Sequence, residues 1–201
     1  MKTIVEKALS NSHSYPEYRK LVSDLLLEGK ATGKEQSDDL INYTNLNQSR
    51  MNRLDKTLQV PQENILKLKS LQKDYVWLIL SEGWCADGAQ LLPVFNKIAN
   101  ESDKIETKIV FRDENEDLMN LFLTNNGKSI PKLIVIDKET GAIRKDWGPR
   151  PQEANVLIKN YKEKHGLVDA TAKSDLQMWY FHDKGLSTQE ELINLMLDLE
   201  V

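Results

Sequence analysis

The stretch from Leu78 to Pro93 constrains the fold more than any other part of the chain. It reads Leu-Ile-Leu-Ser-Glu-Gly-Trp-Cys-Ala-Asp-Gly-Ala-Gln-Leu-Leu-Pro, an apolar run followed by a glycine-containing turn and a helical pattern. Cys85, the only cysteine, stands where the helix is expected to begin. The continuous apolar run from Tyr75 to Leu80 is typical of a central strand that is buried on both faces. An α/β fold is therefore predicted.

Two interpretations of Cys85 follow from its position. Unpaired backbone N–H groups and the positive end of the helix dipole meet at a helix N-terminus, and both favour the thiolate form. The thiolate is the nucleophile in cysteine chemistry, so the first interpretation is a reactive thiol. The second interpretation is a buried cysteine that only fills space, which is the commoner use of a free cysteine. Position alone leaves both open.

The apolar pattern predicts a regular series of elements around this stretch. In chain order we expect strand 75–80, helix 86–100, strand 105–112, helix 116–124, strands 133–137 and 142–147, and helix 151–165. The last two strands form a hairpin whose turn ends at Gly141. Proline removes a backbone donor inside a helix, so Pro93 is expected to bend the helix that contains it. The predicted order is β-α-β-α-β-β-α.

Helical patterns extend the chain on both sides of this series. On the N-terminal side the first helix is expected at the capping-box pattern Ser14–Glu17, and two more begin near Ser37 and after Pro61. Two helices follow Gly166, the second opening with another capping box at Ser187–Glu190. The N-terminal extension is expected either to cover a sheet edge or face, or to form a homodimer surface.

The N-terminal extension also carries charges of mixed sign, among them Arg50, Arg53, Asp55 and Lys56. Such runs on helices are usually exposed to solvent, so we favour a solvated face over a ligand-binding cluster. No chemistry is therefore assigned to this extension.

Composition argues against several classes of function. The 27 basic and 31 acidic residues are interspersed and give a net charge of −4, which disfavours a nucleic-acid or anionic-membrane binder. No segment approaches the roughly 18 apolar residues of a membrane span, and the first ten residues lack a signal-peptide pattern. A lone cysteine suits a reducing compartment, so a cytoplasmic protein is expected. His13, His165 and His182 show no metal-ligand spacing, and neither a metal nor a cofactor is predicted.

The residues around Cys85 resemble the thioredoxin family. Trp84 precedes the cysteine, Pro93 follows it by eight residues, and Ile130-Pro131 stands just before an expected strand. The family has a Trp-Cys active-site turn, a proline in the helix that follows, and a cis-proline beside the cysteine. The resemblance implies a thioredoxin-like βαβαββα core with a mixed sheet over residues 73–166. Residues 1–72 would form an N-terminal helical extension, and residues 167–201 a C-terminal helical extension packed on the core.

Further phrases are similar to a bacterial subgroup that carries helical extensions at both ends. They are Glu82-Gly-Trp-Cys85, Arg112-Asp-Glu-Asn115 and Trp147-Gly-Pro-Arg-Pro151. Two positions depart from the common family pattern. Gly88 stands where the second cysteine would be, and Ile79 stands where ordinary thioredoxins have a buried acid. The resemblance thus implies the fold and a single active-site thiol, without dithiol chemistry.

The candidate site contains two groups of residues. The predicted catalytic group is Trp84, Cys85 and Asp87, and the predicted substrate-binding group is Gly88, Arg112, Ile130, Pro131 and Arg150. Asp87 is interpreted either as an acid–base partner that acts through water or, with somewhat more weight, as a first-turn residue that suits the helix N-terminus. Ile130-Pro131, if cis, would present backbone groups to an extended substrate segment.

The two arginines of the substrate-binding group each have two interpretations. Arg112 lies at the carboxyl edge of the sheet, where ligands of α/β proteins tend to bind, or it pairs with Asp113 or Glu116. Arg150, rigidly displayed between two prolines, reaches a carboxylate or phosphate of a ligand, or it braces the hairpin.

The predicted function is thiol–disulfide exchange or reduction through Cys85 as a monothiol. The substrate would be a disulfide-containing protein or a small thiol compound, and an external thiol would have to release the mixed disulfide. Two alternatives remain. One is a redox-inactive binding module that kept the fold, and the other is a peroxide sensor in which Cys85 is oxidised to sulfenic acid.

Overall fold

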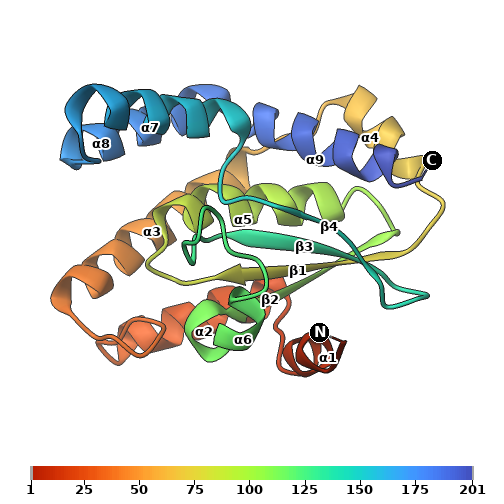
Figure 1. The fold of residues 1–201 in the computed structure, drawn as a ribbon, viewed down its shortest axis with the longest axis horizontal. Coiled ribbons are helices and arrows are strands. Elements are labelled where there is room, and N and C mark those ends of the chain that lie inside the picture. The colour runs from red at the N-terminus through yellow and green to blue at the C-terminus, as the bar shows by residue number, and fades with distance from the viewer. Residues whose placement is uncertain (1, 201) are drawn as a thin grey trace.

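A computed structural model describes residues 2–200 and confirms an α/β fold built on a four-stranded mixed sheet (Figure 1). The strands are β1 (Tyr75–Ser81), β2 (Ile105–Phe111), β3 (Lys132–Asp137) and β4 (Ile143–Trp147). Their order in the sheet is β2-β1-β3-β4, with β2 parallel to β1 and β3 antiparallel to both β1 and β4. Every residue of β1 is buried, as its continuous apolar run predicts for a central strand.

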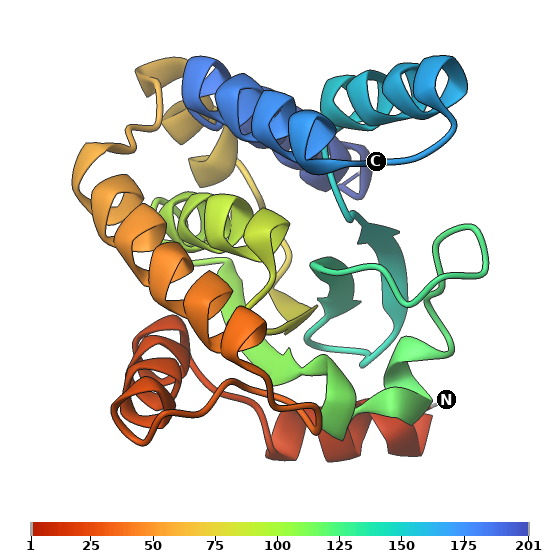
Figure 2. The same cartoon turned by 90° about the vertical axis from the view of Figure 1, so that its left-hand side faces the viewer.

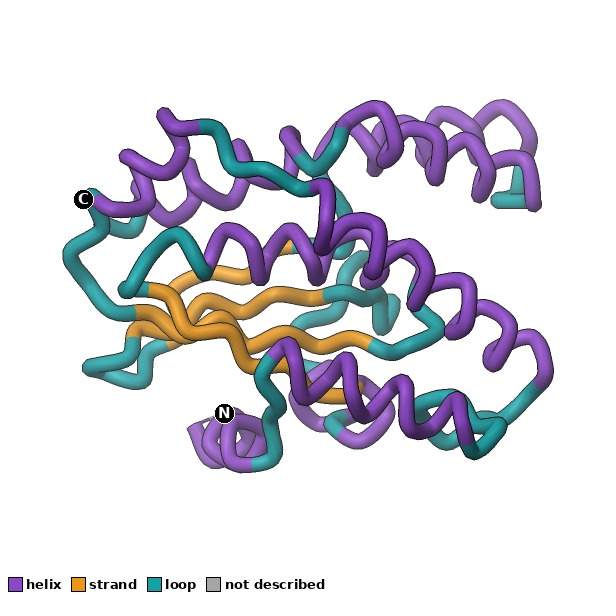
Figure 3. Tube along the Cα trace, turned by 180° about the vertical axis from the view of Figure 1, so that it is seen from behind, coloured by secondary structure: helices purple, strands orange, loops and turns teal. Residues whose placement is uncertain are grey.

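Helices lie on both sides of the sheet (Figure 3). They are α1 (Lys2–Ser10), α2 (Tyr15–Leu27), α3 (Asp38–Thr57), α4 (Gln62–Lys69), α5 (Ala86–Ala99), α6 (Glu116–Met119), α7 (Gln152–His165), α8 (Ala170–Asp183) and α9 (Leu186–Asp198), with a 3-10 turn at Arg112–Glu114. The sheet together with α5, α6 and α7 gives the predicted β-α-β-α-β-β-α order. The layer that contains α7 and α9 lies beyond α5, away from the sheet (Figures 1 and 2).

Alternate residues of β1 enter two hydrophobic clusters, one on each face of the sheet. On the face that α5 covers, the rings of Trp77 and Phe95 meet edge to face with centroids 6.4 Å apart. Helix α9 extends this cluster, and the Sδ of Met196 lies 3.3 Å from the Nε1 of Trp77. On the opposite face, Leu78 packs in a cluster with residues of α1 and α6, and Cys85 belongs to this second cluster.

The N-terminal segment covers part of the outer edge of the sheet. His13, between α1 and α2, exchanges two backbone hydrogen bonds of 2.8 Å with Ile109 of β2. The predicted capping box then begins α2, because the Ser14 hydroxyl accepts from the Glu17 N–H and the Glu17 carboxylate accepts from the Ser14 N–H. Unpaired groups on an edge strand tend to pair with other chains. Covering a sheet edge is therefore one role that this extension performs.

Two helices near the ends of the chain differ from the sequence-based expectation. Helix α1 is an additional helix that the sequence analysis did not predict, and the helix predicted at the Ser14 capping box is α2. The second predicted capping box is wrong, because α9 begins at Leu186 after Gly185, which has a φ of +78°. Ser187 therefore lies inside the helix, and its hydroxyl donates to the carboxylate of Asp183 instead of capping a free N–H.

The helix predicted for residues 116–124 is also shorter than expected and ends at Met119. The chain turns at Asn125 and Asn126, whose φ values of 50° and 62° lie in the left-handed region. The flanking Thr124 and Gly127 exchange two backbone hydrogen bonds across this turn. Two consecutive residues with positive φ form a tight hairpin turn, which a continuing helix cannot accommodate.

Candidate active site and ligand cavity

Cys85 is the N-cap residue of α5 and follows β1 in the predicted turn. Its Sγ accepts a hydrogen bond from the N–H of Gly88 at 3.2 Å and donates one to the backbone oxygen of Ile130 at 3.3 Å. The Ile130–Pro131 bond is cis, as the family resemblance implies, and the Gly148–Pro149 bond is cis as well. Cys85 is only 6% exposed. Its thiol thus has a donor and an acceptor as partners in the neutral form.

Of the two interpretations of Cys85, the environment of the thiol opposes the first, a reactive thiol with a lowered pKa. Burial raises the pKa of the Cys85 thiol to about 12, and the Asp87 carboxylate raises it further, whereas the Gly88 N–H and the Arg150 charge lower it by less. The helix N-terminus supplies only a partial positive charge, while burial removes the water that would stabilise a full negative charge. The thiol is therefore protonated at neutral pH.

Asp87 is a buried carboxylate with two side-chain partners. Its Oδ2 accepts hydrogen bonds from the Nε and Nη2 of Arg150 at 2.9 and 2.7 Å, and its Oδ1 accepts one from the Tyr180 hydroxyl at 2.8 Å. Burial, and then the Asp87 charge, raises the pKa of Tyr180 well above its ordinary value. Arg150 thus reaches a carboxylate, as its position suggested, but this carboxylate belongs to the protein. Asp87 joins α5 to α8 as well as occupying the first helical turn.

Arg112 pairs with Asp113, which was the second of its two predicted roles, at 2.8 Å. The same guanidinium lies 4.9 Å from the ring centroid of Trp84, a distance typical of a cation–π contact. The Nε1 of Trp84 donates to the backbone oxygen of Thr32 at 3.1 Å. The N-terminal extension therefore fixes the tryptophan that precedes the cysteine.

Glu82 was not among the predicted site residues, although it lies in the same turn as Cys85. It is 1% exposed, and its Oε1 accepts a hydrogen bond from the Asp113 N–H at 2.9 Å. Its Oε2 has no hydrogen-bond partner among residues 2–200. Burial raises the pKa of Glu82 to about 7. The sequence could have marked Glu82 as a site residue by its position directly after a fully apolar strand. A carboxylate there is buried unless the chain turns outward at once.

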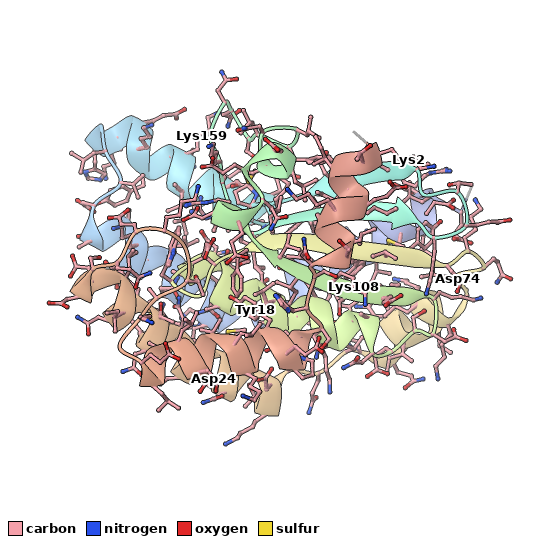
Figure 4. The ribbon with its side chains drawn as sticks, turned by 90° about the horizontal axis from the view of Figure 1, so that it is seen from below. Lys2, Tyr18, Asp24, Asp74, Lys108 and Lys159 are labelled. Carbon is pink, nitrogen blue, oxygen red and sulfur yellow. The ribbon has the colours of Figure 1, made fainter. Side chains whose placement is uncertain are left out.

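Tyr18 of α2 is a second residue near this turn that the sequence analysis did not select. Its side chain is 2% exposed and lies on the opposite side of α2 from Asp24, as Figure 4 shows. Burial raises the pKa of Tyr18, and negative charge on Cys85 or Glu82 raises it further. Helix α2 therefore supplies a neutral hydroxyl to the interior behind the cysteine.

A cavity of about 440 Å³ opens beside Cys85. Six of the predicted site residues line it, namely Trp84, Cys85, Asp87, Arg112, Ile130 and Arg150. The other two, Gly88 and Pro131, are buried and do not line the cavity, and Gly88 contacts the thiol through its N–H. The structure therefore brings most of the predicted residues together around one space.

The two helical extensions also line this cavity, which the sequence analysis missed. Helix α3 contributes Arg50 and α8 contributes Lys173. Arg50 is half-buried, so assigning it to a purely solvated face was wrong. The Nη1 of Arg50 donates to the Oδ1 of Asn47 at 2.8 Å, and the Nδ2 of Asn47 donates to the backbone oxygen of Gly83 at 2.9 Å. The available signal was Asn47 itself, which falls at helical spacing between the apolar residues Tyr43 and Met51.

Two further properties concern the described part of the chain as a whole. Residues 2–200 contain no group of three or more His, Cys, Asp or Glu side chains placed to hold a metal ion. None of the helices in this range has the length and apolar character that crossing a membrane requires.

Comparison with solved structures shows the fold in other proteins. A protein of unknown function from Pseudomonas aeruginosa is 18% identical, with a TM-score of 0.59 over 94% of this chain and 99% of that one. An HIV epitope-scaffold is 17% identical, with a TM-score of 0.58 over 94% of this chain and 100% of that one. No curated protein matches this chain.

At such low identity these structures show the fold and do not assign the chain to a family. A family model makes that assignment. The model described as thioredoxin matches residues 33–162, well over half of the chain. The matched range contains the whole sheet, the turn with Cys85 and the cis-proline, and it also includes α3 and α4. The chain therefore belongs to the thioredoxin family.

Proposed function

We propose that this thioredoxin-fold protein binds a small ligand in the cavity beside Cys85 and keeps that cysteine as a neutral thiol. The observation that carries the proposal is the hydrogen bonding of the thiol. The Sγ–H donates to the Ile130 oxygen at 3.3 Å while the Sγ accepts from the Gly88 N–H at 3.2 Å. A thiolate would lose the first bond and face a carbonyl oxygen, which opposes ionisation.

The surroundings of the thiol also oppose exchange with a protein disulfide. The Ile130 oxygen, which an extended substrate segment would use for backbone pairing, already accepts the hydrogen bond from Cys85. No second cysteine exists to resolve a mixed disulfide. A cavity of about 440 Å³ lies within the range of about 300–1,000 Å³ that is usual for small-molecule sites. These features support binding more than turnover.

Monothiol exchange is the second candidate, because Cys85 itself lines the cavity. In that reaction the sulfur of Cys85 would form a mixed disulfide with one half of a small disulfide and release the other half as a thiol. A second, external thiol would then attack the mixed disulfide and restore Cys85. The cavity supports access of a small disulfide to the sulfur, while the raised pKa of Cys85 opposes the first attack.

The pH dependence of Cys85 alkylation by iodoacetamide tests the proposal. With a pKa of about 12, the rate is expected to rise steadily to pH 11 without a plateau. At neutral pH it should lie roughly three-thousandfold below the rate of free cysteine, whose pKa is about 8.5. Reduction of hydroxyethyl disulfide by glutathione should be the same with the wild type and with Cys85→Ser. A plateau below pH 8.5, together with turnover that Cys85→Ser abolishes, would establish monothiol exchange instead.

A further inference from the structure

We infer that the cavity beside Cys85 is an anion site completed by the two helical extensions, and that it takes a small molecule with a negatively charged group and an apolar part. The inference rests on the proposed ligand-binding function and adds the chemical class of the ligand. The charged side chains that line the cavity are five cations and one carboxylate: Arg50, Arg112, Lys128, Arg150, Lys173 and Asp87. In a chain of net charge −4, this concentrates positive charge where the average is negative.

Three of these cations already have carboxylate partners in the protein. The pairs are Arg112–Asp113 at 2.8 Å, Arg150–Asp87 at 2.7 Å and Lys128–Glu116 at 3.5 Å. Arg50 of α3 and Lys173 of α8 form no ion pair with any residue in the range 2–200. The two extensions thus each bring one uncompensated positive charge to the cavity.

Arg50 is positioned rather than freely solvated. Asn47, which is 1% exposed, holds its Nη1 and in turn holds the backbone oxygen of Gly83, one residue before Trp84. This connection ties the guanidinium to the cysteine turn. A half-buried guanidinium without a carboxylate partner loses part of its hydration without compensation, and an anion in the cavity would restore it.

The remaining lining predicts that the ligand also has an apolar part. The Trp84 ring, with Arg112 4.9 Å from its centroid, forms one wall, and Leu40 of α3 and Leu176 of α8 lie around the same space. A planar ring or an alkyl chain packs well against such a wall. A small organic anion therefore fits this cavity better than an inorganic ion or a neutral molecule.

Anilinonaphthalene sulfonate, a fluorescent organic anion, and phenylnaphthylamine, its neutral parent, test the inference. The full-length protein should bind the sulfonate saturably and with lower affinity as salt is added. Arg50→Gln and Lys173→Gln should each weaken sulfonate binding by about tenfold, the effect of one charge-assisted contact. Neither change should alter binding of the neutral parent, and Arg50→Lys, which keeps the charge, should weaken sulfonate binding less.

Arg53→Gln is the matched control, because it removes the same charge from the same helix. The Arg53 guanidinium lies 5.5 Å from the ring centroid of Phe181 and does not line this cavity. The affinity of the Arg53→Gln variant for the sulfonate should therefore equal that of the wild type. Unchanged affinity in both Arg50→Gln and Lys173→Gln, or an equal loss in Arg53→Gln, would overturn the inference.

Thermal unfolding shows whether each variant is folded at the titration temperature. If Arg50→Gln is unfolded there, sulfonate binding by Arg50→Lys and Lys173→Gln tests the anion site. The outcome is separable from that of the proposed function. Charge-dependent sulfonate binding by a protein whose Cys85 turns over would refute the neutral-thiol proposal alone. An inert Cys85 without charge-dependent binding would refute the anion site alone.

Discussion

Cys85 and Glu82 lie three residues apart in one turn, and burial moves both pKa values upward, to about 12 and about 7. Beside this turn, the Asp87 carboxylate of α5 and the Arg150 guanidinium from the segment after β4 neutralise each other at 2.7 Å. Acids without such a partner retain their protons to higher pH because water no longer stabilises the charged form. At the scale of single residues, burial outweighs the favourable position at a helix N-terminus.

Glu82→Gln should change how stability depends on pH. Native Glu82 holds its proton up to about pH 7, whereas the unfolded chain releases it near the ordinary value of 4.5. The native state therefore binds more protons between these values, and the wild type should lose up to about 3 kcal/mol of unfolding free energy as pH rises through this window. Glu82→Gln should lack that part of the slope. Urea unfolding from pH 5 to 8 measures it, and parallel profiles for both proteins would contradict the assignment.

Gly88→Cys would place the family's second cysteine in this chain, but Ser81 opposes it. A Cβ at position 88 would lie 2.5 Å from the Oγ of Ser81 and 3.5 Å from the Sγ of Cys85. We expect the single substitution to cost about 1–3 kcal/mol, as overpacking of a buried site usually does. Ser81→Ala should recover most of that loss, since the Ser81 Oγ has no hydrogen-bond partner among residues 2–200. Urea unfolding of both single variants and the double variant tests this coupling, and strictly additive effects would exclude it.

Two side-chain hydrogen bonds join helices α5 and α8: the Tyr180 hydroxyl donates to the buried Asp87 carboxylate at 2.8 Å, and the Nε2 of Gln90 donates to the Oε1 of Gln177 at 2.8 Å. Asp87 holds Arg150 from the segment after β4 at the same time. Three elements that are distant in sequence therefore share one buried carboxylate. At the scale of elements, this group links the C-terminal extension to the candidate site.

Tyr180→Phe should destabilise the protein by about 2 kcal/mol, because it removes a hydrogen bond to a buried charge. Tyr161→Phe is the matched control, since the Tyr161 hydroxyl also bonds a carboxylate, that of Asp169, in a more exposed place. The control should stay within about 0.5 kcal/mol of the wild type. Chemical denaturation of the two variants measures their free energies of unfolding. Equal losses of stability would show that the buried hydrogen bond contributes no more than the exposed one.

The two capping-box patterns show what element-level reasoning can and cannot predict. Ser14 begins α2 as predicted, because its side chain meets a free N–H at the first turn. Ser187 belongs to the same sequence pattern, yet the N-cap of α9 is Gly185, two residues earlier, at a φ of +78°. The glycine allows a left-handed residue just before the helix, so the start moves upstream and the serine becomes an interior residue.

The C-terminal extension makes side-chain contacts with the sheet across long sequence separations, and the N-terminal extension pairs with β2 through the backbone of His13. Trp77 of β1 contacts Met196, and the Nε1 of Trp147 donates to a carboxylate oxygen of Glu191 at 2.8 Å. The Tyr75 hydroxyl donates to Glu200 at 2.9 Å. We therefore propose that residues 1–72, 73–166 and 167–201 unfold as one cooperative unit, although only the middle range has the thioredoxin-like order.

Limited proteolysis tests this proposal for the whole molecule. Trypsin should leave the chain largely intact under native conditions, because cleavage needs local unfolding and the extensions are packed on the sheet. Met196→Ala should lower stability by about 2–5 kcal/mol, the usual range for truncating a buried methionine, and should speed digestion of the entire chain. Rapid trimming of the wild type to a stable fragment near 73–166 would show that the extensions are separate from the core.

The sequence by itself determined the fold class and most of the candidate site. The apolar run at β1, the turn before Cys85 and the Ile130-Pro131 step are local patterns, and local patterns fix strands, turns and the start of a helix. The family resemblance then placed six residues that line one cavity. The strands, the turn and the helix start depend on neighbours in the chain, so the sequence displays them directly, whereas the grouping of the six residues came from the resemblance.

Only the tertiary structure decided the chemistry of the site. The protonation of Cys85 depends on burial and on Ile130, and the role of Asp87 depends on Tyr180, 93 residues away. In the sequence, Arg50 is one of several charges on a helix, and only the structure shows that Asn47 holds it at the cavity. A pKa and a binding surface depend on desolvation and on charges brought together in space. Contacts between distant segments determine both, and no local pattern in the chain records them.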